Sequence, residues 1–498
     1  MTPDWSRLSP RMLLVHPVHE VIRQIPVLVG SLVLGSATGN PLWTLAGVVL
    51  VVGFGLARWF TTTYRIGADE VQLRSGVLRR VVLSVPRNRI RSVSTDARLL
   101  HRLLGLTVLK VSTGQEAAGD TAFELDAVPA GDVARLRAVL LADSSAVPDP
   151  ADSSAVPDLA DSSAVELARW QPSWLRYSAL TPTGLVTIAA VLGVLSQAGV
   201  LRALQDSALA RNGQQVLDEL GTAAAVASAA AVVLVAAIAL SVTQSLLTYG
   251  NLVLRRDTAR DAGVLQLSHG LVRVRERAFD MRRLRGGTLR EPLLVRLFGG
   301  ARLDAVMTGV TGAGEASQLL PPCPRPTAEA VLGDLIGRPD AVTGALTGHG
   351  PAATRRRWTR AMLLPAAAAV GLAVWSAAGG VPVWAWVATA LTAAACAALA
   401  ADRARSLGHR IGGGWLVARA GSLHRRRDCV ASAGIVGWTV RQTLPQRRAG
   451  VATLIAATAA GVKRYEVIDV PAEQAWAIAG ATSPWLSATR WAQRGREH

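Results

Sequence analysis

The chain has 498 residues, half of them hydrophobic, a mean hydropathy of +0.30 and a formal net charge of +18. These values are unusual for a single soluble domain and predict apolar spans combined with water-exposed modules. The three cysteines, Cys323, Cys396 and Cys429, form no CxxC pair, which argues against a disulfide framework and a zinc site. The first 18 residues hold charges and prolines, so we expect no cleavable signal peptide.

A glycine spacing of 29 residues occurs three times along the chain. A pair of long apolar stretches precedes each occurrence, so the sequence predicts three repeats of a membrane hairpin followed by a strand-rich module. We interpret the repeat-defining glycines as structural: Gly76 and Gly105, Gly270 and Gly299, Gly421 and Gly450.

The first repeat begins with an N-terminal segment and membrane hairpin over 1–57, with apolar stretches at 21–38 and 42–57. Module 1 is expected at 58–141. Apolar and polar residues alternate in 71–74 and 107–112, which is typical of half-buried strands, and 77–85 is also predicted to be a strand. A closing helix is predicted to start at Val128-Pro129-Ala130, because proline is favoured in the first turn of a helix.

The second repeat follows a low-complexity acidic linker at 142–168, which repeats ADSSAVPD-like text and is predicted to be a flexible tether. Membrane hairpin 2 is expected at 169–248, with apolar stretches at 180–201 and 222–247. Module 2, at 249–338, diverges most in its first strand. The Pro-rich stretch 321–324 is predicted to lead into its closing helix, near Thr327.

The third repeat comprises a linker and membrane hairpin over 339–402, module 3 over 403–486 and a tail over 487–498. Its apolar stretches are 361–378 and 381–401, joined by Gly379-Gly380. Val470-Pro471-Ala472 matches the start of the closing helix of module 1, so the same helix is expected here.

Arginines flank the outer ends of all three hairpins, whereas the turns of the first and third carry no charge. By the positive-inside rule, both termini and all three modules are expected in the cytoplasm, with the chain a multipass plasma-membrane protein. No predicted span has an acidic residue in its interior, which argues against ion-coupled transport.

Positive charge is concentrated in the modules, where 58–115, 255–310 and 402–465 together hold 35 Lys or Arg against 11 Asp or Glu. One interpretation is ordinary topology with solvated strand faces; another is contact with anionic lipid headgroups or an acidic partner surface. Nucleic acid is disfavoured, because module 1 lacks an aromatic pair for stacking. The candidate lipid- or partner-binding residues are Arg79, Arg80, Arg87, Arg89, Arg91, Arg425, Arg426 and Arg427.

Motifs for catalysis are missing from the sequence. It contains no GxxxxGK[ST] loop, HExxH or GxSxG. Gly412-Gly413-Gly414 lacks the Lys-Ser/Thr of a phosphate loop and is predicted to be a turn between strands. We therefore expect no enzyme activity, catalytic residue, cofactor or metal site.

Several short motifs resemble a known family. They are Val15-His16-Pro17, Tyr64-Arg65-Ile66 opening a strand, Ser75-Gly76-Val77, Val85-Pro86 and Arg89-Ile90. In this order around a hairpin, they resemble the bacterial PH-like bPH2 module of YdbS/YdbT-type membrane proteins, and three units resemble the YdbT-like type. The resemblance covers roughly 15–142 well, 402–480 fairly, and 170–337 mainly by spacing.

The resemblance implies an α+β membrane protein with six transmembrane helices in three hairpins. Each hairpin would be followed by a PH-like β-sandwich or barrel with a C-terminal helix. The implied function is a membrane scaffold that binds anionic lipid or a partner protein, in a setting associated with resistance to antimicrobial peptides. The expected partners are membrane lipids and a second membrane protein of the same module type (YdbS-like). The alternative is a transport or export component of a membrane complex.

Overall fold

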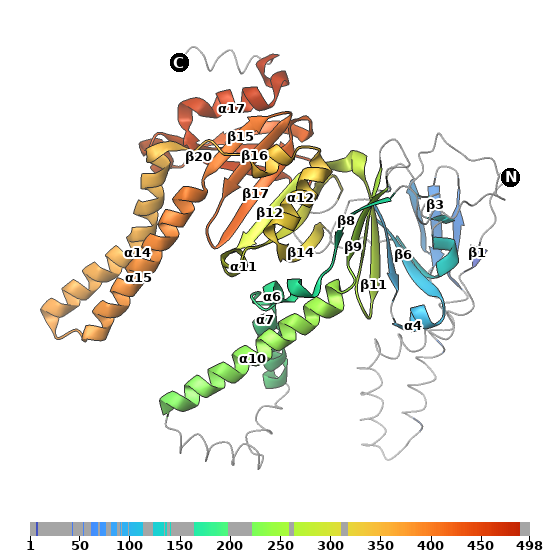
Figure 1. The fold of residues 1–498 in the computed structure, drawn as a ribbon, viewed down its shortest axis with the longest axis horizontal. Helices are drawn as coiled ribbons and strands as arrows, with labels where there is room; N and C mark the ends of the chain where they lie inside the picture. The colour runs from blue at the N-terminus through green and yellow to red at the C-terminus, as the bar shows by residue number, and fades with distance from the viewer. Residues whose placement is uncertain are drawn as a thin grey trace. The chain divides into compact units, whose positions relative to one another are not determined.

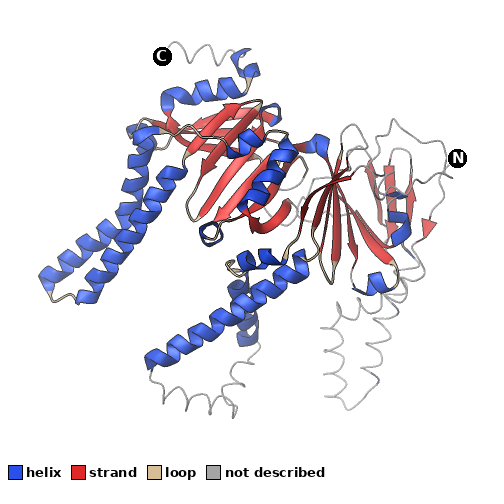
Figure 2. Ribbon diagram, viewed as in Figure 1, coloured by secondary structure: helices blue, strands red, loops and turns tan. Residues whose placement is uncertain are grey.

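The computed structural model describes 164–197, 222–257, 263–309 and 317–488 continuously, and shorter segments of the N-terminal third, chiefly 61–67, 70–75, 81–86, 92–97, 99–112 and 123–133 (Figure 1). Figure 2 shows antiparallel sheets together with long helices, which confirms the α+β class. The chain divides into two compact units: 1–169 with 247–283, and 170–246 with 284–498.

The first unit contains two antiparallel sheets. One has the order β1-β2-β3-β4, made of β1 (Ser6–Arg7), β2 (Thr63–Ile66), β3 (Glu70–Ser75) and β4 (Val81–Pro86). The other has the order β7-β6-β5-β11-β10-β9-β8, made of β5 (Ser92–Ala97), β6 (Leu106–Ser112), β7 (Phe123–Pro129), β8 (Ala164–Arg169), β9 (Val253–Asp257), β10 (Val264–His269) and β11 (Val274–Asp280). The short helix α4 (Leu99–Leu103) lies between β5 and β6.

The second unit also contains two antiparallel sheets. One has the order β14-β13-β12-β17-β16-β15, made of β12 (Leu284–Pro292), β13 (Gly300–Met307), β14 (Gln318–Pro324), β15 (Gly408–Gly412), β16 (Trp415–Ala420) and β17 (His424–Ala431). The other has the order β18-β19-β20, made of β18 (Ile435–Arg441), β19 (Val451–Thr458) and β20 (Arg464–Pro471). Its short helices are α6 (Leu175–Ser178), α11 (Leu293–Leu297), α13 (Pro339–Thr343) and α16 (Leu444–Arg448).

Neighbouring modules share sheets. Strands β7, β6 and β5 of module 1 form one sheet with β11, β10 and β9 of module 2, because β5 pairs with β11. In the second unit, β14, β13 and β12 of module 2 form one sheet with β17, β16 and β15 of module 3, because β12 pairs with β17. The strands of 249–338 are therefore divided between the two compact units.

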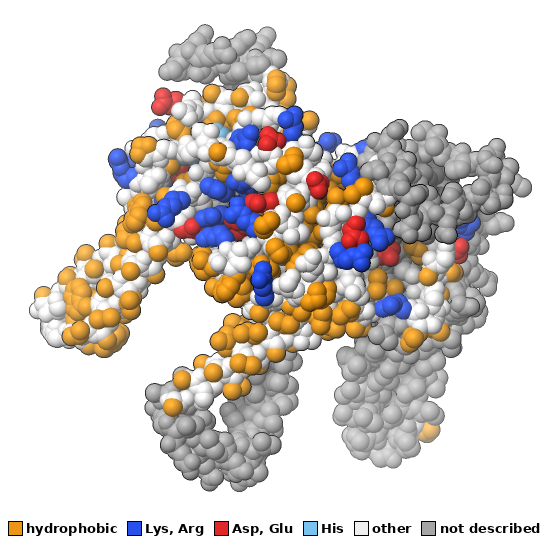
Figure 3. All heavy atoms as spheres, viewed as in Figure 1, with side chains coloured by type: hydrophobic (Ala, Val, Ile, Leu, Met, Phe, Trp, Pro, Cys, Tyr) orange, Lys and Arg blue, Asp and Glu red, His pale blue; other side chains and the backbone are white. Residues whose placement is uncertain are grey.

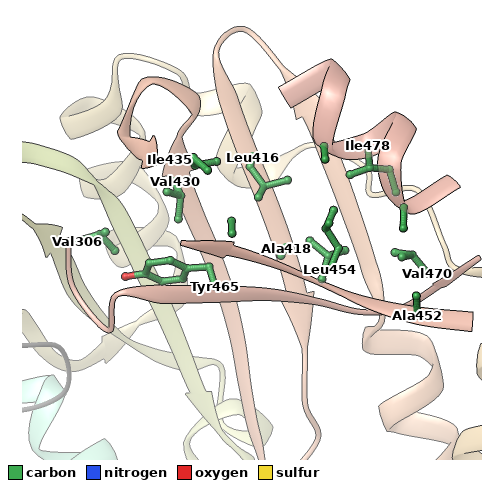
Figure 4. Close-up of a cluster of buried hydrophobic side chains, with 14 of the residues drawn as sticks. Val306, Leu416, Ala418, Val430, Ile435, Ala452, Leu454, Tyr465, Val470 and Ile478 are labelled. Atoms are coloured by element: carbon green, nitrogen blue, oxygen red, sulfur yellow. The ribbon is translucent and has the colours of Figure 1, made fainter. Parts of the chain in front are cut away.

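The core of module 3 lies between its two sheets and its closing helix, α17 (Ala475–Thr482) (Figure 4). Leu416 comes from the first sheet, Leu454 and Val467 from the second, and Ile478 from the helix. Module 1 repeats the plan, since Val71, Val93 and Leu109 of its two sheets pack with residues that follow β7. These interiors provide the apolar burial that offsets chain ordering.

The described repeat glycines all have positive φ. Gly270 and Gly421, at 111° and 103°, turn the chain between two strands, and a Cβ on either would overlap a backbone oxygen. Gly105, Gly299 and Gly450, at 65° to 76°, end the short helices α4, α11 and α16, as glycine often does. The 29-residue spacing thus runs from a strand turn to a helix end. Gly76 lies outside the described residues.

Three helices in the described residues are long and apolar enough to cross a membrane: 230–249 within α10 (Thr222–Tyr249), nearly all of α14 (Gly350–Ala378), and α15 (Val383–Ser406). Helix α7 (Thr183–Gln197) is apolar and shorter. Helices α14 and α15 pack against each other as a hairpin (Figure 1). Nearly all of the predicted first hairpin, and 198–221 in the second, lie outside the described residues.

The predicted end of the linker differs from the structure, whereas the Pro-rich stretch does lead into the closing helix of module 2. The linker extends only to residue 163, because 164–169 forms β8 and pairs with β9. The Pro-rich stretch 321–324 belongs to edge strand β14, where a missing ladder hydrogen bond is tolerated. The closing helix α12 (Arg325–Ile336) begins near Thr327, as predicted, directly after Pro324.

Candidate functional site

Five of the eight candidate basic residues lie outside the described residues: Arg79, Arg80, Arg87, Arg89 and Arg91. The other three, Arg425, Arg426 and Arg427, lie on β17, an inner strand of the six-stranded sheet. Their surroundings are therefore those of a module–module boundary.

The three β17 arginines have acidic or low-dielectric surroundings. An Arg425 guanidinium nitrogen lies 2.5 Å from Asp402, and Arg426 lies 3.2 Å from Asp428. Arg427 is buried, which lowers the pKa of its guanidinium, and complete burial raises the pKa of Asp428. Thr288 of β12 donates a hydrogen bond of 2.8 Å to Asp428. This cluster therefore ties module 3 to module 2.

A cleft of about 560 Å³ lies beside this cluster and includes Arg290, Arg302, Arg425 and Arg426 in its lining. Each of these arginines has an ion pair within the unit. Arg290 and Arg302 pair with Asp304, Arg425 pairs with Asp402, and Arg426 pairs with Asp428. The positive charge of this cleft is therefore largely compensated.

A second cleft, of about 880 Å³, lies between the N-terminal turns of α14 and the segment around α16. We call it the α14–α16 cleft. Among the described residues that line it, Glu466 is the only acidic one. Its basic lining residues are Arg355, Arg356, Arg360, Arg441 and Arg448.

Four of these arginines stand apart from the acidic residues that the structure describes. Among the described residues, none lies in ion-pair range of Arg355, Arg360, Arg441 or Arg448, and all four are exposed. Arg356 is instead held by Asp469. Figure 3 shows basic side chains, with acidic ones among them, over the sheet beside the module end of the α14–α15 hairpin, and hydrophobic side chains along the outer part of that hairpin. The cleft thus combines unpaired positive charge with the end of a candidate membrane span.

Local sequence explains the shape of the α16 side of the cleft. Thr443 and Gln446 form a capping box at the start of α16, with the Thr443 backbone N–H donating to the Gln446 side chain at 2.9 Å. Pro445 occupies the first turn, where a missing N–H costs little. The short helix ends at Arg448, and Arg441 ends the preceding strand β18, so both basic side chains line the same cleft.

Asp469 fixes the base of α14 to the module. Its side chain is completely buried, and its carboxylate lies 2.7 Å from both Arg356 and Arg357. Gln446 donates a further hydrogen bond of 2.8 Å. Helix α14, strand β20 and helix α16 therefore meet at a single carboxylate.

Two buried histidines lie at the start of the same helix. His349 Nδ1 lies 2.7 Å from the Ile468 carbonyl oxygen, and His349 Nε2 lies 3.1 Å from His409 Nδ1. In a neutral His349 whose Nδ1 donates to the carbonyl, Nε2 is the acceptor and His409 Nδ1 is the donor. Burial lowers the pKa of His409, and lowers that of His349 to about 4.

The described residues provide no evident redox or metal chemistry. They contain no group of three or more His, Cys, Asp or Glu positioned to hold a metal ion. Burial raises the pKa values of Cys323 and Cys429 to about 12, which disfavours the reactive thiolate.

Sequence reasoning identified one side of the α14–α16 cleft and missed the other. Arg355, Arg356 and Arg360 are recognisable as the basic flank of a predicted span. Arg441 and Arg448 were not singled out. The only local signal for them is Gln446-Arg447-Arg448, directly before a repeat glycine.

The fold and the cleft define a protein of repeated two-sheet modules with closing helices, joined to apolar helices that could span a membrane. The family model of the bacterial PH domain matches residues 21–144 and 362–483. The chain thus contains two matched copies of the bacterial PH domain, which confirms the resemblance to this domain family. No curated protein and no solved structure matches the chain.

Proposed function

We propose that this protein is a multipass membrane scaffold whose bacterial PH modules bind anionic phospholipid. The observation that carries the proposal is the α14–α16 cleft, where four uncompensated arginines surround the end of a candidate span. The finer topology belongs to the proposal: six spans in three hairpins, with termini and modules in the cytoplasm, in a YdbT-like arrangement. A role in envelope defence against antimicrobial peptides is part of the same proposal.

The position and chemistry of the cleft suit a lipid phosphate. Basic residues near an anionic leaflet gain about 1 kcal/mol each, and this attraction falls off within a Debye length. Arginine binds phosphate oxygens in a bidentate geometry that lysine does not reproduce. A volume of about 880 Å³ is within the range of small-molecule sites and can accept a phosphoglycerol headgroup.

The alternative, a transport or export component, has no comparable support among the described residues. The groove between α14 and α15 is lined mainly by apolar side chains such as Met362, Ala369 and Trp386. The polar groups between α6–α7 and α10 bond to one another, as Ser178 does to Ser245 at 2.6 Å. A polar path is not evident in these contacts.

The test is lipid titration of the purified full-length protein in nanodiscs that contain phosphatidylcholine with increasing phosphatidylglycerol. Bound lipid is counted by native mass spectrometry. At about 1 kcal/mol per arginine, the double variant Arg360→Gln and Arg448→Gln should bind phosphatidylglycerol roughly 30-fold more weakly.

The matched control is Arg405→Gln, because Arg405 is exposed in the last turn of α15 and lies outside the cleft. It removes one positive charge at the same end of the hairpin, so nonspecific attraction alone should weaken lipid binding at most about 5-fold, well short of the loss in the double variant. Equal loss in the control and the double variant would show nonspecific charge attraction and would overturn the proposed site.

A further inference from the structure

The two module boundaries are built in the same way. Strand β11 of module 2 pairs with β5 of module 1, and β17 of module 3 pairs with β12 of module 2. The registers contain Val274 opposite Ala97 and Arg425 opposite Glu291. Val274 and Arg425 are each the fourth residue after the first repeat glycine of their own module. Ala97 and Glu291 are each the eighth residue before the second repeat glycine of the preceding module. The two boundaries therefore have the same register.

Strand β18 has the same local geometry as β12. The pairing of β12 with β13 has an irregularity between Leu284 and Gly286, and the pairing of β18 with β19 has one between Ile435 and Gly437. These positions are equivalent when counted from the repeat glycines. Strand β18 is therefore shaped like a strand that joins the next module.

The first and the last module each have one of these joining strands as the outermost strand of a sheet. Strand β4 is the counterpart in module 1 of β11 and β17, and it ends the first sheet. Strand β18 is the counterpart in module 3 of β5 and β12, and it begins the last sheet. Among the described strands, none pairs with the outer side of β4 or β18, although all four counterparts are paired.

The side chains of these two edges favour pairing. Val81 and Val82 of β4 are 52% and 53% exposed, and Val436 of β18 is 70% exposed. Strand β4 contains no charged residue and a single proline, Pro86, at its end, and Arg441 is the only charged residue of β18. Proteins commonly protect permanent edges with charges or proline. The edge strand β14, with its three prolines, follows that rule.

We infer that the occupant of these edges is a second copy of this chain, with β18 of one copy paired to β4 of the next. The repeated register then places Val81 opposite Arg441 and Val82 opposite Val440. It also places Val85, which packs in the core of module 1, opposite Gly437. The second boundary has the same combination, since core residue Val430 lies opposite Gly286.

This contact is heterologous, because the two copies use different strands. Repetition of a heterologous contact gives a closed ring or an open chain of copies, according to the rotation between them. Within one chain, the same contact already joins modules whose hairpins are candidates for a common membrane. A second copy in that membrane therefore needs no new type of pairing. This assembly is independent of lipid binding.

Disulfide cross-linking tests the register. In an otherwise full-length Cys396→Ala background, V81C with one tag is mixed in detergent with R441C carrying another tag. Opposite residues on paired strands lie within the Cα distance that a disulfide needs. Mild oxidation should give a reducible heterodimer that contains both tags. The remaining cysteines, Cys323 and Cys429, are buried.

The matched control combines V81C with V436C, which is exposed on the same strand. In the inferred register it lies five residues from the correct position, roughly 16 Å away at about 3.3 Å per residue. Heterodimer formation with R441C and little with V436C supports the inference. Equal yields from both pairs, or a V81C–V81C dimer as the main product, would overturn it. Circular dichroism checks that each variant is folded.

Discussion

Replacement of Asp469 by Asn should detach the base of α14 from module 3. Asp469 has no exposed surface and a φ of 57°, a conformation that Asn also tolerates. The substitution therefore removes the negative charge while preserving the size and backbone preference of the residue. Arg356 and Arg357, each about nine-tenths buried, are left without their counter-ion.

The expected loss is large because an unpaired buried charge is costly. Removal of one partner from a buried ion pair typically costs about 3–5 kcal/mol. At about 2–4 °C per kcal/mol for units of this size, the unfolding midpoint should fall on the order of 10 °C. Thermal unfolding of the purified protein in detergent, followed by tryptophan fluorescence, measures this directly.

Glu466→Gln is the matched control, because Glu466 is also on β20 but is only partly buried and lies 3.9 Å from exposed Arg464. An exposed pair of this kind contributes less than about 1 kcal/mol. If Asp469→Asn lowered the midpoint no more than Glu466→Gln, the carboxylate would not be what anchors α14.

Three further outcomes are expected. Burial depresses the folded-state pKa of His349 to about 4, so as pH falls the unfolded state binds a proton at this residue before the folded state does. The free energy of unfolding should therefore decrease as pH drops from about 6.5 to about 4. Denaturant titrations should show that His349→Gln flattens this pH dependence. In thermal scans, Gly421→Ala should destabilise clearly more than Gly450→Ala, because a Cβ at 421 would meet the His424 oxygen whereas 450 is open; equal losses would contradict that reasoning. Charge reversal of Arg79, Arg80 and Arg89 should weaken vesicle or partner binding, and unchanged binding in a flotation assay would remove module 1 from the proposal.

The repeat plan could be predicted because it depends on local signals. The positions of Gly270, Gly299, Gly421 and Gly450 require positive φ, and glycine meets that requirement at little cost. Helix α10 begins at Thr222, where its apolar stretch was predicted to begin. Long apolar runs and turn residues therefore revealed the order of elements along the chain.

The sharing of sheets between modules could not be predicted, because it depends on pairing between strands far apart in the sequence. Arg425, Arg426 and Arg427 form a basic run that is typical of an exposed binding surface. In the fold their partners are Asp402, Asp428 and the low-dielectric interior of a module boundary. A single sequence does not show which strand lies beside β17, so it does not show which charges are compensated.

The most direct test of lipid binding at the α14–α16 cleft is an electron cryo-microscopy map of the protein in nanodiscs that contain phosphatidylglycerol. We predict headgroup density within hydrogen-bond distance of Arg360 and Arg448, at the module end of α14. The double variant Arg360→Gln and Arg448→Gln should lack that density under the same conditions. A well-resolved wild-type cleft without lipid density, or one closed by neighbouring side chains, would contradict the proposed function.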